Sequence, residues 1–135
     1  MGAGYSKRSL VEKLGIKSGW HVALIGAPLD YKSTLGHLPE GVELIAQIAG
    51  PIEFIQVFVT EQHDLQAMFD QLKAGILPAG MLWVSWPKRS SGVATDLDEN
   101  IIREIGLEHG LVDVKVCAVD DTWSGLKFVY RLKDR

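Results

Sequence analysis

The fold of this chain is decided by the stretch Leu82-Trp83-Val84-Ser85-Trp86-Pro87-Lys88-Arg89-Ser90-Ser91-Gly92. Its first half is almost continuously apolar, which is typical of a strand buried on both faces of a sheet. The run breaks at Pro87 into a cationic, hydroxyl-rich loop that ends at a glycine. A second loop, Thr122-Trp123-Ser124-Gly125-Leu126-Lys127, has a similar Trp, Ser, Gly and Lys composition. Because binding residues concentrate in loops, the two stretches predict a functional place on the molecule.

Strands and helices are expected to alternate along the chain on either side of this stretch. Period-2 and continuous apolar runs predict strands at 21–26, 42–48, 54–59, 81–86, 112–118 and 126–132. Helices are expected at 6–14, as a weak turn at 29–35, after Thr60 and after Asp96, where Asp96 and Glu99 suggest a capping box. This order predicts one α/β domain over residues 1–135 with a three-layer, Rossmann-like sheet. The sheet should be mostly parallel and close with an antiparallel C-terminal hairpin.

One connection does not fit a simple parallel sheet. Only a few residues around Ala49-Gly50-Pro51 join the 42–48 strand to the 54–59 strand. A parallel crossover needs about a dozen residues or more. We therefore expect the 42–48 strand to be antiparallel, short or at an edge, with its direction left open.

Composition excludes several classes of protein. A chain of 135 residues suits a single domain with its own core. A net charge of -3 argues against a general nucleic-acid binder. No apolar run is long enough to span a bilayer, and Cys117 is the single cysteine, which suits a reducing compartment. We therefore expect a cytoplasmic protein without membrane association.

Two resemblances follow from longer stretches. The segments 13–26 and 72–82, together with the closing hairpin, resemble class I S-adenosylmethionine methyltransferases. The segments 83–88, 95–97, 111–118 and 123–126 are similar to an uncharacterised family of short bacterial proteins, a domain of unknown function. The first resemblance implies a methyltransferase-like fold, and the second implies a bacterial cytosolic origin without naming an activity.

The chain departs from the methyltransferase pattern where that family holds its cofactor. The family's cofactor site needs successive glycines after the first strand, so that the backbone can approach the ligand closely. It usually also has an acidic residue at the end of the second strand. Here the first loop, 26–31, has one glycine and a proline, and the second strand ends Ala46-Gln47-Ile48 without a carboxylate. The usual pocket is therefore expected to be missing or degenerate, and the sequence names no cofactor.

The candidate site lies at the carboxyl edge of the predicted sheet, where open α/β sheets bind ligands. The two tryptophan loops should meet there, with Lys88 and Arg89 as partners for an anion and with the N-terminus of the helix after Asp96 close by. No catalytic residue and no metal ligand is assigned. The predicted ligand-binding residues are Trp86, Lys88, Ser90, Ser91, Thr95, Trp123 and Ser124.

Each part of this site also has a purely structural explanation. Either Trp83 or Trp86 should point into the core, because a strand alternates its faces. The Asp120-Asp121 pair fits turn chemistry, and Cys117 fits a structural thiol.

Three functions stay open on the sequence alone. The chain could be a non-catalytic module for a small anionic or nucleotide-like ligand or a protein partner. It could also be a diverged S-adenosylmethionine-dependent methyltransferase. The third is a structural or regulatory homodimer, joined through a sheet edge or an apolar patch around Trp20 or Trp123.

Overall fold

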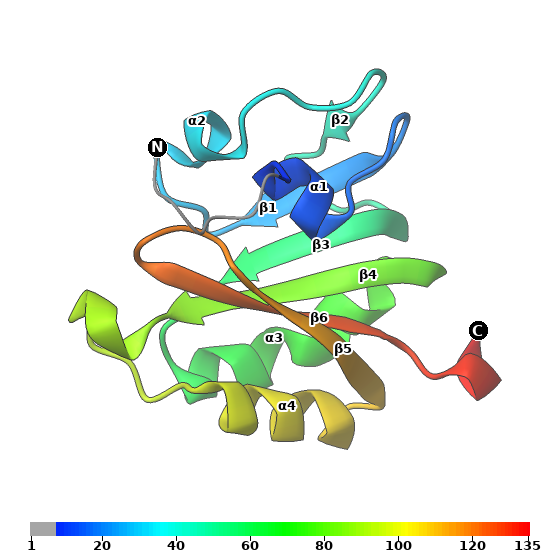
Figure 1. Cartoon of the computed structure of the whole chain (residues 1–135). Coiled ribbons are helices and arrows are strands. Elements are labelled where there is room, and N and C mark those ends of the chain that lie inside the picture. Colours follow the sequence, from blue (N-terminus) through cyan, green and yellow to red (C-terminus); the bar gives the residue numbers. More distant parts are fainter. Residues whose placement is uncertain (1–7) are drawn as a thin grey trace.

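A computed structural model describes residues 8–135 and contains one six-stranded sheet with helices on both faces (Figure 1). The strands are β1 His21–Ile25, β2 Glu43–Leu44, β3 Ile52–Phe58, β4 Ile76–Pro87, β5 Leu111–Ala118 and β6 Trp123–Tyr130. The helices are α1 Leu10–Leu14, α2 Tyr31–Leu35, α3 Gln62–Ala74 and α4 Glu99–Glu108, with short 3₁₀ turns η1 Arg89–Ser91 and η2 Leu132–Asp134. The beginning of the first predicted helix, at Ser6, lies outside the described residues.

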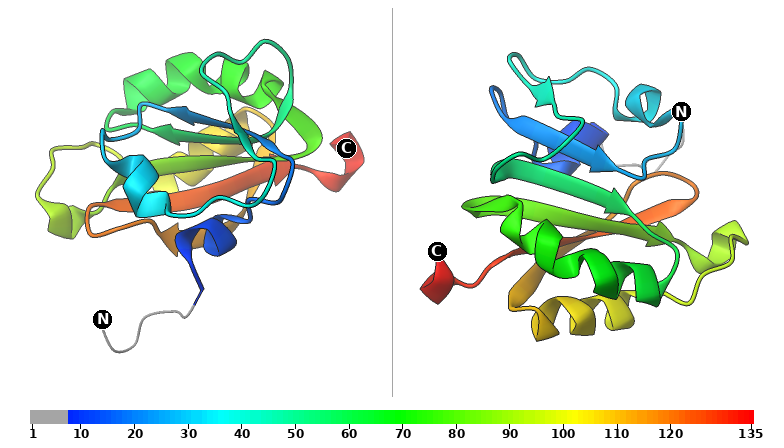
Figure 2. Two further views of the ribbon diagram at one scale, coloured as in Figure 1. Left: turned by 90° about the horizontal axis from the view of Figure 1, so that it is seen from above. Right: turned by 180° about the vertical axis from the view of Figure 1, so that it is seen from behind.

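The sheet is mostly parallel, as the sequence predicts. Its strand order is β2-β1-β3-β4-β6-β5, in which β2, β1, β3 and β4 pair in parallel and β6 pairs antiparallel with both β4 and β5. Helices α1 and α2 lie on one face of the sheet, and α3 and α4 lie on the other (Figure 2). The predicted three-layer α/β architecture with a closing antiparallel hairpin is confirmed.

The strand predicted at 42–48 is short, lies at the edge and is parallel to its neighbour. Only Glu43 and Leu44 pair with β1, opposite His21 and Val22 at the beginning of that strand. Strand β2 therefore ends near the amino edge of the sheet. The connection from β2 to β3 does not have to cross the length of the sheet before β3 begins. This placement explains how so short a connection joins two parallel strands.

The strand predicted at 81–86 begins earlier, because residues 76–80 are also part of β4. The register between β3 and β4 shifts there, because Ile52 pairs with Ile76 whereas Phe54 pairs with Met81. Three extra residues of β4 are thus absorbed by an irregularity in the ladder. Gly80 is required at this point, since a Cβ atom would lie 2.8 Å from the Glu53 carbonyl oxygen.

The helices begin at different caps from those predicted. Glu61, not Thr60, precedes α3, and Asp98, not Asp96, is the N-cap of α4, where its side chain accepts from the Ile101 N–H. The predicted Asp96–Glu99 capping box is therefore wrong. Among residues 8–135 no helix has the length and apolar character needed to cross a membrane.

The two faces of the sheet have cores of different composition. The core under α3 and α4 is entirely apolar and includes Phe69, Ile102 and Phe128. The core under α1 and α2 includes Trp83, Phe54 and Phe58, and on this face a polar chain of Tyr31, Gln56 and Ser85 is buried as well. The sequence predicts that one of Trp83 and Trp86 points into the core, and in the structure both are buried, Trp83 on the α1 face and Trp86 on the α3 face.

Candidate functional site

The two tryptophan loops lie side by side at the carboxyl edge of the sheet. In the β4–β6 ladder Trp86 pairs with Ser124 and Pro87 pairs with Trp123. Beyond the ladder the Lys88 N–H donates to the Thr122 carbonyl at 2.8 Å. The loops meet because β6 begins at the edge where β4 ends.

The predicted side chains nevertheless divide between the two faces of the sheet. Trp86 is buried in the core under α3 and α4, and Ser124 is its cross-strand neighbour. Trp123 lies on the opposite face, where its ring meets that of Phe58 edge-on at 5.1 Å. Trp86 and Trp123 therefore belong to two separate environments and do not line one pocket.

The loop hydroxyls are mostly engaged within their own loop. Ser91 Oγ donates to the Lys88 carbonyl at 2.7 Å and accepts from the Val93 N–H. Thr95 Oγ1 donates to the Thr60 carbonyl at 2.5 Å and accepts from the Leu97 N–H. These two hydroxyls hold the loop in shape and have little capacity left for a ligand, whereas Ser90 is exposed.

A cavity of about 540 Å³ lies beside this loop on the α3 and α4 face. Two of the predicted residues, Trp86 and Thr95, are in its wall, and Arg89 is its basic residue. The full lining is Trp86, Pro87, Arg89, Gly92, Val93, Ala94, Thr95, Asp96, Leu97 and Asp98. This loop cavity is the part of the predicted site that forms a concave surface.

Two carboxylates of the loop cavity are bound to helix N-termini. Asp96 Oδ1 accepts from the Gln62 N–H at 2.8 Å, at the start of α3, and Gln62 Nε2 donates to the Asp96 carbonyl. Asp98 Oδ1 accepts from the Ile101 N–H at 2.8 Å, at the start of α4. Asp98 caps the N-terminus of α4, which the sequence analysis expects to lie close to the site, and its carboxylate offsets part of the positive charge at that end.

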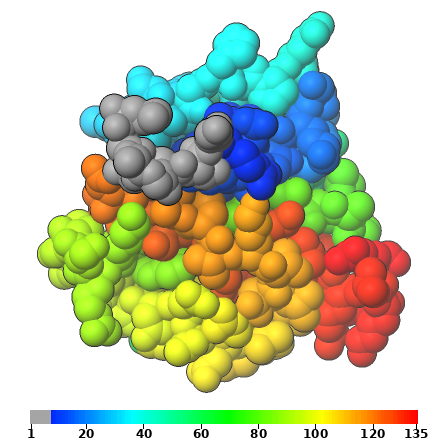
Figure 3. All heavy atoms as spheres, in the orientation of Figure 1, coloured from blue at the N-terminus to red at the C-terminus, as the bar shows by residue number. Residues whose placement is uncertain are grey.

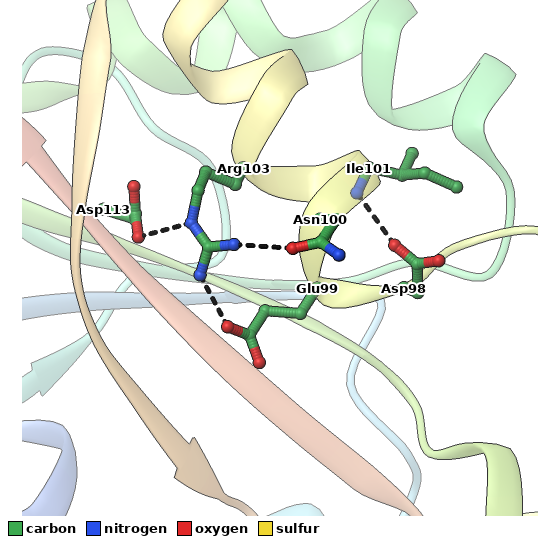
Figure 4. Close-up of polar contacts among 6 residues, drawn as sticks. All are labelled: Asp98, Glu99, Asn100, Ile101, Arg103 and Asp113. Atoms are coloured by element: carbon green, nitrogen blue, oxygen red, sulfur yellow. Dashed lines mark hydrogen bonds and ion pairs between the residues drawn. The ribbon is translucent and has the colours of Figure 1, made fainter.

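Arg103 joins α4 to β5 through polar contacts (Figure 4). Its Nε donates to Asp113 at 2.8 Å, and the other guanidinium nitrogens donate to Asn100 and Glu99. The hydrogen bonds that Arg103 donates, above all to Asp113 and then to Glu99, raise the pKa of Arg103 above its usual value. The cluster could not be identified from the sequence, because Asp113 is ten residues from Arg103 and lies on β5 rather than on α4.

On the α1 and α2 face, aromatic side chains of the chain itself pack together in the region that follows the carboxyl end of β1. Tyr31 is 1 % exposed, and its ring meets that of Phe58 edge-on at 4.7 Å. Trp123 completes the group on the other side of Phe58. Gly26 has a φ of +70°, and a Cβ there would lie 3.0 Å from the Phe58 carbonyl. Gly26 thus serves close packing against β3.

The buried polar chain ties Tyr31 to the middle of the sheet. Tyr31 Oη donates to Gln56 Oε1 at 2.7 Å, and Gln56 Nε2 donates to Ser85 Oγ at 3.0 Å. Burial raises the pKa of Tyr31 far above its usual value, so this phenol stays protonated. The available signal was Gln56, a lone polar residue in an otherwise apolar strand.

A smaller cavity lies where β1 and β2 end. It measures about 220 Å³ and is lined by Leu24, Lys32, Leu44, Ile45 and Ala46. This volume is below the roughly 300 Å³ at which pockets for drug-sized ligands begin. The lining has no carboxylate that could hold a ribose.

In the acidic pair at the β5–β6 turn, Asp120 stabilises the turn itself. Asp120 Oδ1 accepts from the Thr122 and Trp123 N–H groups, each at 2.8 Å. A side chain that binds its own backbone two residues on is an Asx turn. Burial raises the pKa of Cys117 on the adjacent strand, which fits a structural thiol.

The sequence matches no protein-family model and no curated protein. Solved structures share its fold. A methyltransferase dependent on S-adenosylmethionine from Aquifex aeolicus aligns over 88 % of this chain and 86 % of its own, with 18 % identity and a TM-score of 0.63.

Two further structures agree with that likeness. The ribosomal protein L11 methylase from Lactobacillus delbrueckii subsp. bulgaricus has 13 % identity and a TM-score of 0.60, over 90 % of this chain and 75 % of its own. A TehB-like methyltransferase from Corynebacterium glutamicum has 10 % identity and a TM-score of 0.59, over 90 % and 85 %. This chain has a methyltransferase-like fold. At these identities the likeness concerns the fold alone.

Proposed function

We propose that this chain is a non-catalytic module of the methyltransferase-like fold that binds a small anionic or nucleotide-like ligand in the loop cavity. The observation that supports this most is the 540 Å³ cavity at the carboxyl edge, whose lining includes Trp86 and Arg89. Open α/β sheets bind their ligands at this edge. An aromatic face beside a guanidinium suits a planar molecule with negative charge.

The chemistry of the cavity wall favours binding over catalysis. Thr95 Oγ1 and one carboxylate oxygen each of Asp96 and Asp98 bind backbone groups of the chain itself. The lining includes no histidine or cysteine. A general base or a nucleophile needs a group that can reach the substrate, and Arg89 is too basic to serve as either.

The test is a titration of purified protein with a panel of nucleotides and anionic metabolites, followed by tryptophan fluorescence. We expect at least one nucleotide to change the emission saturably, and we expect Arg89→Met to weaken its binding about tenfold, since a charge-assisted hydrogen bond is lost. Arg131→Met, an exposed arginine paired with Asp134, is the matched control and should bind as the parent does. A panel without any effect, or an Arg89→Met variant that binds normally, would contradict the proposal.

The alternative is a diverged methyltransferase that still binds S-adenosylmethionine. Its support is the shared fold over nearly the whole chain. Against it stand the aromatic side chains after β1 and the small cavity beside β2. Saturable heat on titration with S-adenosylmethionine would favour this alternative.

Self-association through a sheet edge is a third proposal with one observation in its favour. Strand β5 ends the sheet, and its Val114 and Val116 side chains are 54 % and 46 % exposed. An open edge strand can pair with another chain. A concentration-dependent mass by light scattering would support a dimer, and a constant monomer mass would exclude it.

A further inference from the structure

One row of side chains across the sheet meets the end of helix α1. Trp83 of β4, Lys127 of β6 and Lys115 of β5 pair directly across the two ladders. The outer two anchor the helix: Trp83 Nε1 donates to the Leu14 carbonyl at 2.9 Å, and Lys115 Nζ donates to the Lys13 carbonyl at 3.0 Å. On the face seen in Figure 3, α1 lies beside β5 accordingly.

Lys127, in the middle of this row, has no such role. Within residues 8–135 no hydrogen bond and no ion pair of its ammonium group is found, although its side chain is half-buried. Lysine is seldom buried without a partner, because removing an ammonium group from water is costly. Helix anchoring explains Lys115 but leaves Lys127 unexplained.

Other positive charges gather around Lys127. Lys115 is its cross-strand partner, and like charges directly opposite one another destabilise a sheet. Burial, together with the charges of Lys115 and Lys17, lowers the pKa of Lys127. Lys13 and Lys115 also act on the nearby Cys117 thiol. Among the described residues none of the ion pairs includes any of these four lysines.

We propose that Lys13, Lys17, Lys115 and Lys127, here called the lysine cluster, form a binding site for a phosphate group on a small molecule. Lys115 and Lys127 are cross-strand neighbours, Lys115 binds the Lys13 carbonyl, and the charge of Lys17 acts on Lys127. Ammonium groups gathered without a carboxylate partner match a multiply charged oxyanion, which could accept from several of them at once. Such an anion would remove the repulsion between Lys115 and Lys127. A net charge of -3 disfavours nucleic acid as the occupant.

The lysine cluster is separate from the loop cavity. It lies on the α1 face, at residues from α1, the connection that follows α1, β5 and β6, whereas the loop cavity lies on the α3 and α4 face. The two proposals can therefore fail independently, and Arg89→Met should leave the lysine cluster unaffected.

The experiment is a titration with sodium pyrophosphate at constant ionic strength, followed by the backbone amide signals of ¹⁵N-labelled protein. We expect saturable shifts at residues 13–17, 115 and 127. Lys127→Met should weaken binding about tenfold or more, because it removes a charge-assisted hydrogen bond. Without ligand the same variant should melt about 2 °C higher than the parent, because the repulsion is relieved.

Controls separate the site from general charge effects. Lys133→Met removes an exposed lysine from η2 and should leave both binding and melting temperature unchanged. Lys17 is also exposed, and Lys17→Met should weaken pyrophosphate binding without a change in folding. This variant keeps the proposal testable if Lys127→Met does not fold. Shifts that sodium chloride reproduces, or an unchanged affinity of Lys127→Met and Lys17→Met, would overturn the proposal.

Titrations with other ligands identify the source of the phosphate group. Binding of adenosine monophosphate as tight as that of pyrophosphate supports a phosphate ester, and a preference for pyrophosphate supports an inorganic anion. A single-stranded oligonucleotide that binds more than tenfold tighter than either would overturn the small-molecule site in favour of a nucleic-acid surface.

Discussion

The two faces of the sheet differ most at its carboxyl edge. On the α3 and α4 face a cavity remains open beside Trp86 and Arg89. On the α1 and α2 face, Tyr31, Phe58 and Trp123 fill the corresponding space, and buried hydrogen bonds through Gln56 and Ser85 hold Tyr31 in place. A shared fold therefore does not determine where a ligand can enter. Here the chain closes one face with its own side chains and leaves the other open.

The largest effect is expected in the apolar core under α3 and α4. Phe128 is fully buried, meets the Phe69 ring edge-on, and lies so close to Gly106 that a Cβ there would be 2.0 Å from its ring. Phe128→Ala should lower the free energy of unfolding by about 4 kcal/mol. Urea denaturation measures this loss.

A double variant sharpens that prediction. Gly106→Ala alone should cost about 3 kcal/mol, because the new methyl group collides with the Phe128 ring. In the Phe128→Ala background the same change should cost far less, since the methyl group enters the space left by the ring. Equal costs in both backgrounds would show that Gly106 does not act through Phe128.

The second largest effect is expected in the polar chain of the opposite face. Tyr31→Phe removes the donor to Gln56 and should cost about 2 kcal/mol, because a buried amide oxygen is left without a partner. Ser85→Ala affects the other end of the chain. The two changes should be coupled by at least about 0.5 kcal/mol in a double-mutant cycle. Strict additivity would show that the three side chains do not act as a unit.

A smaller effect is expected at the helix caps beside the loop cavity. Asp98→Ala should cost about 1 kcal/mol, because it removes the acceptor of the Ile101 N–H. Asp121→Ala is the control, since Asp121 is exposed and has no cap to remove. Thermal unfolding of both variants measures the difference, and an equal loss in the two would count against the cap.

The smallest effect depends on pH and lies at the amino edge, away from both faces of the comparison. Burial would raise the pKa of Glu53, but hydrogen bonds from the backbone and ring of His21 outweigh it and hold that pKa below its usual value. This carboxylate therefore stabilises the fold above its unfolded pKa of about 4.3 and loses its contribution as pH falls through the lower folded value. Glu53→Gln should cost about 0.5 kcal/mol at pH 7 and almost nothing at pH 2. A cost that does not change with pH would contradict this account.

The sequence predicts the architecture well because apolar periodicity and strand order are local signals that the core then enforces. It also brings the two tryptophan loops together, since the end of β4 and the start of β6 follow from topology. It does not show that Trp86 and Trp123 face opposite sides, because one residue of register decides the face of every side chain. Nor does it show the partners of Asp96 and Arg103. These side chains bind Gln62 and Asp113, so only the assembled fold identifies the partners.

The most direct test of this account is calorimetric titration of the full chain with S-adenosylmethionine, in parallel with the nucleotide that gives the strongest fluorescence change. The account predicts no saturable heat with S-adenosylmethionine up to a millimolar excess, because the Tyr31 and Phe58 rings pack against each other in the region that follows β1. It predicts saturable heat with the nucleotide, at an affinity that Arg89→Met weakens about tenfold. Saturable binding of S-adenosylmethionine that Arg89→Met leaves intact would contradict it and would favour a diverged methyltransferase.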